Sequence, residues 1–178
     1  MSDAQRDGEA FEAFFREHYR VVLAYALRRA DPETARDVAA ETFVVAWRRF
    51  EQAPASPRPW LFGIARRMLA NARRGIRRKQ ALVQRLSAQR EVMGSDGEGQ
   101  PAGSPVREAL AGLSANDREI LQLVAWEGLT TKELAVTLGT SATACRVRLH
   151  RARRRFAAAL TRDVGTDPLQ LKQAVEEP

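Results

Sequence analysis

Residues 130–156 read TTKELAVTLGTSATACRVRLHRARRRF, and this stretch decides the fold of the second half of the chain. Thr130 to Glu133 has the form of a capping box, in which a hydroxyl and a carboxylate satisfy backbone N–H groups at a helix start. Gly139 follows the short apolar pattern of this helix and suits a tight turn. Ser141 can then cap a longer helix. Two capped helices joined by a tight turn predict a helix-turn-helix.

The longer helix, expected to end near Leu160, has two contrasting faces on a helical wheel. One face predicts a buried stripe of Cys145, Leu149, Ala152 and Phe156. The opposite face predicts DNA contacts by Thr143, Arg146, Val147, His150, Arg151 and Arg154. Early residues of a helix in the major groove reach base edges, whereas later arginines, here Arg153 to Arg155, meet phosphates. An ordinary amphipathic helix is the alternative.

A glycine- and proline-rich segment, GSDGEGQPAGSP at residues 94–105, separates this half from the front half. It holds no residue that could pack a core, so it predicts a flexible linker. We therefore expect four parts in the chain, which are a front domain at 1–90, a linker at 91–106, a helix-turn-helix domain at 107–160 and a polar tail at 161–178.

The front domain is predicted to contain three or four helices. Apolar residues at three- and four-residue spacing indicate a helix over 11–29. Asp31 followed by proline predicts a capped start for a second helix over 32–50. A loop at 51–59 carries three prolines and precedes a helix over 60–86. Because no convincing strand pattern is present, we predict an all-α fold of two small helical domains joined by a flexible linker.

The charge distribution points to a polyanionic partner. The formal net charge is +7, and all but three of the 29 basic residues are arginine. Residues 52–90 contain ten basic side chains and no acidic one. A solvated helix face usually mixes signs, so a block of one sign favours nucleic acid over that alternative. Trp60 lies at the start of this block, where it can stack on a base or pack, and Trp47 is expected to pack in the core.

Composition also excludes several classes of site. Cys145 is the only cysteine, and the two histidines lack the spacing of metal ligands. We therefore expect no disulfide, no metal and no cofactor, and we find no catalytic set. The sequence has no apolar run of the roughly 20 residues that a membrane helix needs, and its polar start is unlike a secretory signal. A soluble cytoplasmic protein that is not an enzyme is expected.

With these residues placed, the chain resembles an extracytoplasmic-function sigma factor of the sigma-70 family. In the front half the matching segments are ARDVAAETFVVAW at 35–47, similar to a helix that docks on RNA polymerase, and PWLFGIARR at 59–67, similar to the segment that reads the minus-10 promoter element. In the back half EGLTTKELA at 127–135 and RLHRAR at 148–153 resemble the helix-turn-helix that reads the minus-35 element.

This resemblance implies partners and residue roles. The partners are core RNA polymerase, through its β′ clamp and β flap, promoter DNA and an anti-sigma factor, without membrane insertion. Asp37 and Glu41 would pair with basic residues of the clamp. The minus-10 contacts would be Ser56, Arg58, Trp60, Arg66, Arg67, Asn71, Arg73 and Arg74. The minus-35 contacts would come from the exposed face of the longer helix defined above.

The chain departs from the family pattern at several of these positions. Arg36 and Ala40 replace the usual Glu and Gln of the docking helix, and Arg67 replaces a usual Asn. The changes in the docking helix leave Asp37 and Glu41 in place, so docking is still expected. The change on the DNA side bears on promoter sequence and not on the class of function. The main alternative is a stand-alone helix-turn-helix regulator that binds an operator as a dimer. An RNA-binding module would leave the helix-turn-helix unexplained, and an enzyme acting on nucleic acid would need catalytic residues that are not visible.

Overall fold

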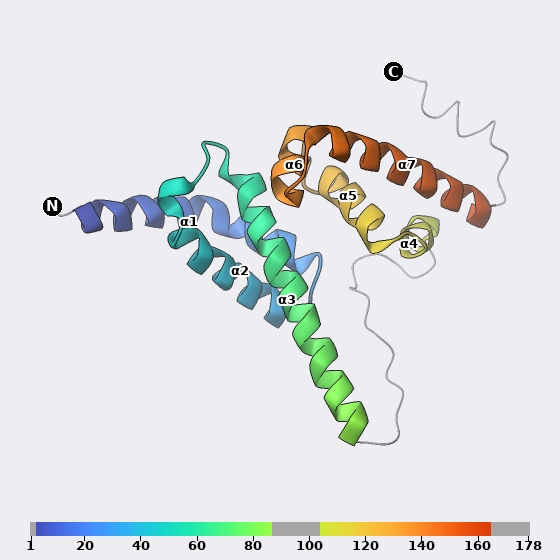
Figure 1. The fold of residues 1–178 in the computed structure, drawn as a ribbon, viewed down its shortest axis with the longest axis horizontal. Helices are drawn as coiled ribbons and strands as arrows, with labels where there is room; N and C mark the ends of the chain where they lie inside the picture. The colour runs from blue at the N-terminus through green and yellow to red at the C-terminus, as the bar shows by residue number, and fades with distance from the viewer. Residues whose placement is uncertain (1–2, 87–103, 165–178) are drawn as a thin grey trace. The chain divides into compact units, whose positions relative to one another are not determined.

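The computed structural model describes residues 3–86 and 104–164, and all regular structure in these ranges is helical (Figure 1). The prediction of an all-α fold is therefore confirmed. The chain divides into two compact units, the first built mainly on α1 to α3 and the second mainly on α4 to α7. In the described part of the chain, no helix combines the length and the apolarity needed to cross a bilayer.

The first unit is a bundle in which α1 (Asp3–Leu27), α2 (Pro32–Trp47) and α3 (Pro57–Leu86) contact one another. Asp31 caps α2, since its Oδ1 accepts a hydrogen bond from the Thr34 backbone N–H at 3.0 Å. That backbone hydrogen bond lowers the pKa of the Asp31 carboxyl. Tyr25 of α1 stacks on Phe62 of α3 with ring centroids 4.7 Å apart. The core therefore contains the aromatic contact that fixes α3 against α1.

Helix boundaries in this unit differ from the prediction at four places, of which the smallest is the end of α1 at Leu27 instead of residue 29. Helix α1 begins at Asp3, because residues 3–10 are polar and give no apolar period to detect although most of them suit a helix. Helix α2 ends at Trp47, and a short 3-10 helix, η1 (Phe50–Gln52), follows it. Helix α3 begins at Pro57, whose fixed φ and missing N–H suit a first helical position. Part of the predicted loop is thus helical.

The second unit contains α4 (Pro105–Ala111), α5 (Ala115–Ala125), α6 (Thr131–Leu138) and α7 (Ala142–Val164). Helix α4 was not predicted and overlaps the end of the expected linker. Most of that linker and of the tail lies outside the described residues, so their boundaries stay a prediction. Arg118 of α5 holds α4 in place, because its guanidinium donates to the carbonyls of Leu110 at 2.9 Å and Ala111 at 2.8 Å. These carbonyls end a helix and lack partners within it.

The helix-turn-helix has the local geometry that its sequence predicts. The Thr130 N–H donates to Glu133 Oε2 at 2.8 Å, and the Glu133 N–H donates back to Thr130 Oγ1 at 3.3 Å. Gly139 in the turn has a φ of +63°, a conformation that favours glycine. Ser141 accepts a hydrogen bond from the Ala144 N–H at 3.1 Å. Both caps and the turn are therefore confirmed.

Candidate nucleic-acid interface

Helix α7 presents the face that its sequence predicts. Cys145 and Ala152 are fully buried and Leu149 nearly so, whereas Phe156 is only half-buried. The opposite face is exposed along its length, at Thr143, Arg146, Val147, His150, Arg151 and Arg154. Val147 is 44% exposed, which is high for an aliphatic side chain. Burial raises the pKa of the Cys145 thiol, so this group stays protonated and unreactive. The helix thus offers a row of cations around one apolar residue.

Arg155 has a different position from its neighbours. Its Nη1 donates to Asp117 Oδ2 at 2.5 Å, which joins the end of α7 to the start of α5. The hydrogen bond from Arg155 lowers the pKa of the Asp117 carboxyl, and the Asp117 side chain is only 11% exposed. Sequence reasoning placed Arg155 near phosphates and missed this pair. The two residues are 38 positions apart, so no local pattern links them.

Helix α3 carries the second basic face. Arg67, Asn71 and Arg74 follow Trp60 at helical spacing, so these side chains lie on one stripe. Arg67, Asn71 and Arg74 are exposed, while Trp60 is half-buried. Arg74 Nη2 donates to Asn71 Oδ1 at 2.5 Å. The stripe is therefore partly ordered by its own hydrogen bond.

The other predicted minus-10 residues lie beside or before this stripe. Arg73 is exposed, and its Nη2 donates to the carbonyl of Arg29 at 3.0 Å, in the turn after α1. Arg66 is half-buried. Arg58 lies on the first turn of α3 with its guanidinium carbon 5.4 Å from the centre of the Phe62 ring. Ser56 is exposed in the loop. The structure thus brings most of these residues to one helix and leaves Ser56 off it.

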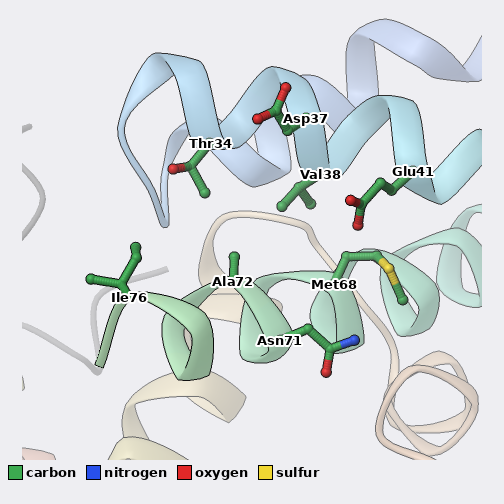
Figure 2. Close-up of a pocket in the computed structure, with 8 residues that line it drawn as sticks. All are labelled: Thr34, Asp37, Val38, Glu41, Met68, Asn71, Ala72 and Ile76. Atoms are coloured by element: carbon green, nitrogen blue, oxygen red, sulfur yellow. The ribbon is translucent and has the colours of Figure 1, made fainter. Parts of the chain in front are cut away.

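Asp37 and Glu41 lie one turn apart on α2 and are both exposed. A cavity of about 350 Å³ lies beside them, and α3 contributes Met68, Asn71 and Ile76 to its lining. Figure 2 shows the Glu41 carboxylate reaching towards α3, while the Asp37 carboxylate points away from it. Neither carboxylate forms an ion pair with another described residue. Both charges are thus available to a cationic partner.

Two apolar side chains on α2 were not anticipated at the surface. Val44 is 51% exposed, and Trp47 is 48% exposed although it was expected in the core. Trp47 contacts Phe11 of α1 edge-on, with ring centroids 4.9 Å apart, and its side chain stays partly exposed. The spacing of Val44 from Asp37 and Glu41 could have indicated a shared face. The exposed side of α2 thus continues from acidic to apolar.

Both halves of the chain are similar to known proteins. Two family models match it, sigma-70 region 2 over residues 14–79 and sigma-70 region 4 over residues 104–156, which together cover more than half of the sequence. The ECF RNA polymerase sigma factor SigL of Mycobacterium tuberculosis is 32% identical over 174 residues, covering 88% of this chain and 92% of SigL.

Two solved structures have a similar fold. CnrH, in complex with the cytosolic domain of CnrY, gives a TM-score of 0.58 at 27% identity, over 90% of this chain and 95% of CnrH. The sigma factor RpoE from Bartonella quintana, in complex with the anti-sigma factor NepR, gives a TM-score of 0.61 at 21% identity, over 86% of this chain and 98% of RpoE. The likeness to RpoE concerns the fold alone.

Proposed function

Because this chain belongs to the extracytoplasmic-function sigma factors of the sigma-70 family, it binds core RNA polymerase and directs initiation at promoters, and we propose how its residues divide this work. The first unit docks on the polymerase clamp and engages the opened minus-10 strand. The second unit reads the minus-35 element as a duplex and contacts the β flap. The chemistry of RNA synthesis stays with the polymerase, in the cytoplasm.

Docking on the polymerase uses the exposed acidic turn of α2. Asp37 and Glu41 have no ion-pair partner among the described residues, so a basic surface on the clamp can pair with them. Charge pairs at the rim of an interface mainly set the association rate and the choice of partner. Met68 and Ile76 line the neighbouring cavity and give the same surface an apolar component.

Promoter contact uses the two basic faces. On α3, Trp60, Arg67, Asn71 and Arg74 form the stripe that meets the minus-10 strand, flanked by Arg58, Arg66 and Arg73, with Ser56 in the preceding loop. On α7, the residues that read base edges in the major groove are Arg146, Val147, His150 and Arg151. Thr143 lies near the N-terminus of this helix, and Arg154 binds a phosphate. Val147 suits the methyl group of a thymine.

An anti-sigma factor is the regulatory partner that we propose. The support is that CnrH, which is 27% identical to this chain, was solved in complex with the cytosolic domain of CnrY, and that RpoE, which has a similar fold, was solved with an anti-sigma factor. Such a partner would have to cover the acidic turn of α2 or one of the two basic faces, because these are the surfaces that the polymerase and the promoter use. Four parts of the chain, with a front domain at 1–90 and a helix-turn-helix domain at 107–160, remain our proposed organisation.

The observation that carries the assignment of sites is the exposed basic face of α7 opposite its buried stripe. Reconstitution with core polymerase tests it together with the docking surface. The purified chain is mixed with core enzyme, the complex is isolated by gel filtration, and transcription is run on a promoter library. We expect a stable complex and transcripts that depend on both promoter elements. DNA binding without a polymerase complex would instead support a stand-alone regulator.

A further inference from the structure

The turn after α1 carries Arg29, a half-buried residue to which none of the sites above gives a role. Its Nη1 donates to the Tyr25 carbonyl at 2.9 Å, and its guanidinium carbon lies 3.8 Å from the centre of the Tyr25 ring. That carbonyl belongs to the last turn of α1, where the helix itself provides no partner. One side chain thus holds both the backbone and the ring of Tyr25.

Tyr25 connects Arg29 to the beginning of α3. Its ring stacks on Phe62 with centroids 4.7 Å apart and planes inclined by 20°, and neither side chain is exposed. Two stacked rings in a close-packed interior cannot turn independently of each other. The Phe62 ring also lies 5.4 Å from the guanidinium carbon of Arg58, on the first turn of α3. The Arg29 guanidinium is therefore linked through two rings to the helix that carries the minus-10 contacts.

The backbone of Arg29 makes a second connection to α3. Its carbonyl accepts a hydrogen bond from Arg73 Nη2 at 3.0 Å. Phe62 and Arg73 are 11 positions apart in the sequence, which is close to three helical turns, so both lie on one face of α3. These two contacts from α3 to the end of α1 therefore lead to the same residue.

The proposed minus-10 stripe lies on another side of α3. Its members are placed roughly 120–180° from Phe62 on a helical wheel. They are Trp60, Arg67, Asn71 and Arg74. A rotation of α3 about its axis would turn the stripe by the same angle, because these side chains leave one continuous helix. Holding the face of Phe62 and Arg73 thus fixes the direction in which the stripe points.

We propose that Arg29 is a positioning residue for minus-10 recognition, which locks the rotation of α3 against α1. Its guanidinium acts through Tyr25 and Phe62, and its carbonyl acts through Arg73. The proposal rests on the promoter role given above to the stripe of α3. Contacts that are placed in advance lose less entropy on binding and discriminate better than loosely held ones. Arg29 improves discrimination in this way without contacting a base.

The test compares full-length variants in holoenzyme, on promoters with single-base changes in the minus-10 or the minus-35 element. Arg29→Met removes the guanidinium and keeps an unbranched side chain and the backbone carbonyl. The preference for the best minus-10 sequence over its single-base variants should fall roughly three- to tenfold, while the minus-35 preference stays at the wild-type value. Arg29→Lys keeps a cation over the Tyr25 ring and should recover most of the loss. Arg20→Met, which removes an equal charge from an exposed position of α1, is the matched control.

A double variant separates positioning from a direct DNA contact. Because Arg29 acts through the stripe, Arg29→Met combined with Arg67→Ala should lose less affinity than the product of the two single losses. A phosphate contact by Arg29 would give the full product, weaken all sequences alike and reduce the log–log salt slope by about 0.9. That result would overturn the positioning role.

Thermal unfolding of each variant distinguishes a loss of stability from a loss of recognition. A lower unfolding temperature with an unchanged minus-10 preference would leave Arg29 a structural role only and contradict the proposal. If Arg29→Met proves unfolded, Arg29→Gln takes its place, because glutamine can still donate to the Tyr25 carbonyl. A reduced minus-10 preference in this variant supports the proposal, and an unchanged one refutes it. A wild-type chain that forms no complex with core polymerase would instead contradict the proposed function itself.

Discussion

The two basic faces of this protein differ in how their arginines are held. On α3, Arg73 donates to a backbone carbonyl and Arg74 to Asn71, so their guanidinium groups are already placed. On α7, Arg146 and Arg151 make no hydrogen bond or ion pair with another described residue. Side chains that are fixed in advance lose less entropy on binding, whereas free ones can adapt to base edges. We therefore expect the first face to hold a strand and the second to read a sequence.

The largest expected effect comes from removing an arginine of α7 that is proposed to read a base edge. Arg146→Ala or Arg151→Ala should cost about 1–3 kcal/mol at the specific promoter and relax the preference at one minus-35 position, because a guanidinium to base-edge contact is lost. Competition binding with single-base promoter variants measures this. Unchanged discrimination in either variant would remove that residue from the reading set.

A charge reversal on α2 separates polymerase docking from DNA binding. Asp37→Arg should weaken binding to core polymerase by about tenfold, because a favourable charge pair becomes a repulsive one. Binding of the full chain to a minus-35 duplex should be unaffected. Glu9→Arg, at an exposed position of α1, is the matched control. Equal co-purification of wild type and Asp37→Arg with core enzyme would argue against the docking assignment.

The ion pair between Asp117 and Arg155 is expected to contribute to the stability of the second unit. Asp117→Asn should lower the unfolding free energy of the second unit by about 1 kcal/mol, because a hydrogen bond to a charged group is lost. The folded state lowers the pKa of Asp117, so its stabilisation is complete above the unfolded pKa of about 3.9 and disappears as pH falls through the folded value. Thermal unfolding of both proteins at a series of pH values should show the difference shrink as the pH falls below about 3.9.

The smallest expected effect concerns a phosphate contact on α7. Arg154→Ala should weaken binding to all sequences by a similar small factor and reduce the log–log salt slope by about 0.9, because one phosphate is no longer neutralised. Titration at several salt concentrations on specific and scrambled duplexes measures both quantities. A loss confined to the specific duplex would move Arg154 from phosphate binding to base reading.

The features that could be predicted from the sequence are those that depend on residues close to one another along the chain. The capping box at Thr130, the turn at Gly139 and the two faces of α7 depend on residues within a few positions of each other, so the sequence was sufficient for them. The family of the chain also followed from such segments.

Features that depend on tertiary packing were missed. Trp47 was expected in the core because it is large and apolar, but its place at the end of α2 leaves half of it exposed. Arg73 meets a carbonyl 44 positions away, and Arg155 meets a carboxylate 38 positions away. The start of α1 was missed for another reason, since a polar helix has no apolar period.

The contact between Arg73 and the Arg29 carbonyl has a consequence for the chain before it meets a promoter. A phosphate that takes the Nη2 hydrogen bond of Arg73 must displace this carbonyl, which then needs water or another donor. The turn after α1 thus competes with DNA for one of the ten basic side chains in residues 52–90, a stretch that contains no acidic residue. The first unit should hold stray DNA less tightly than its charge suggests, which leaves promoter engagement to the assembled holoenzyme.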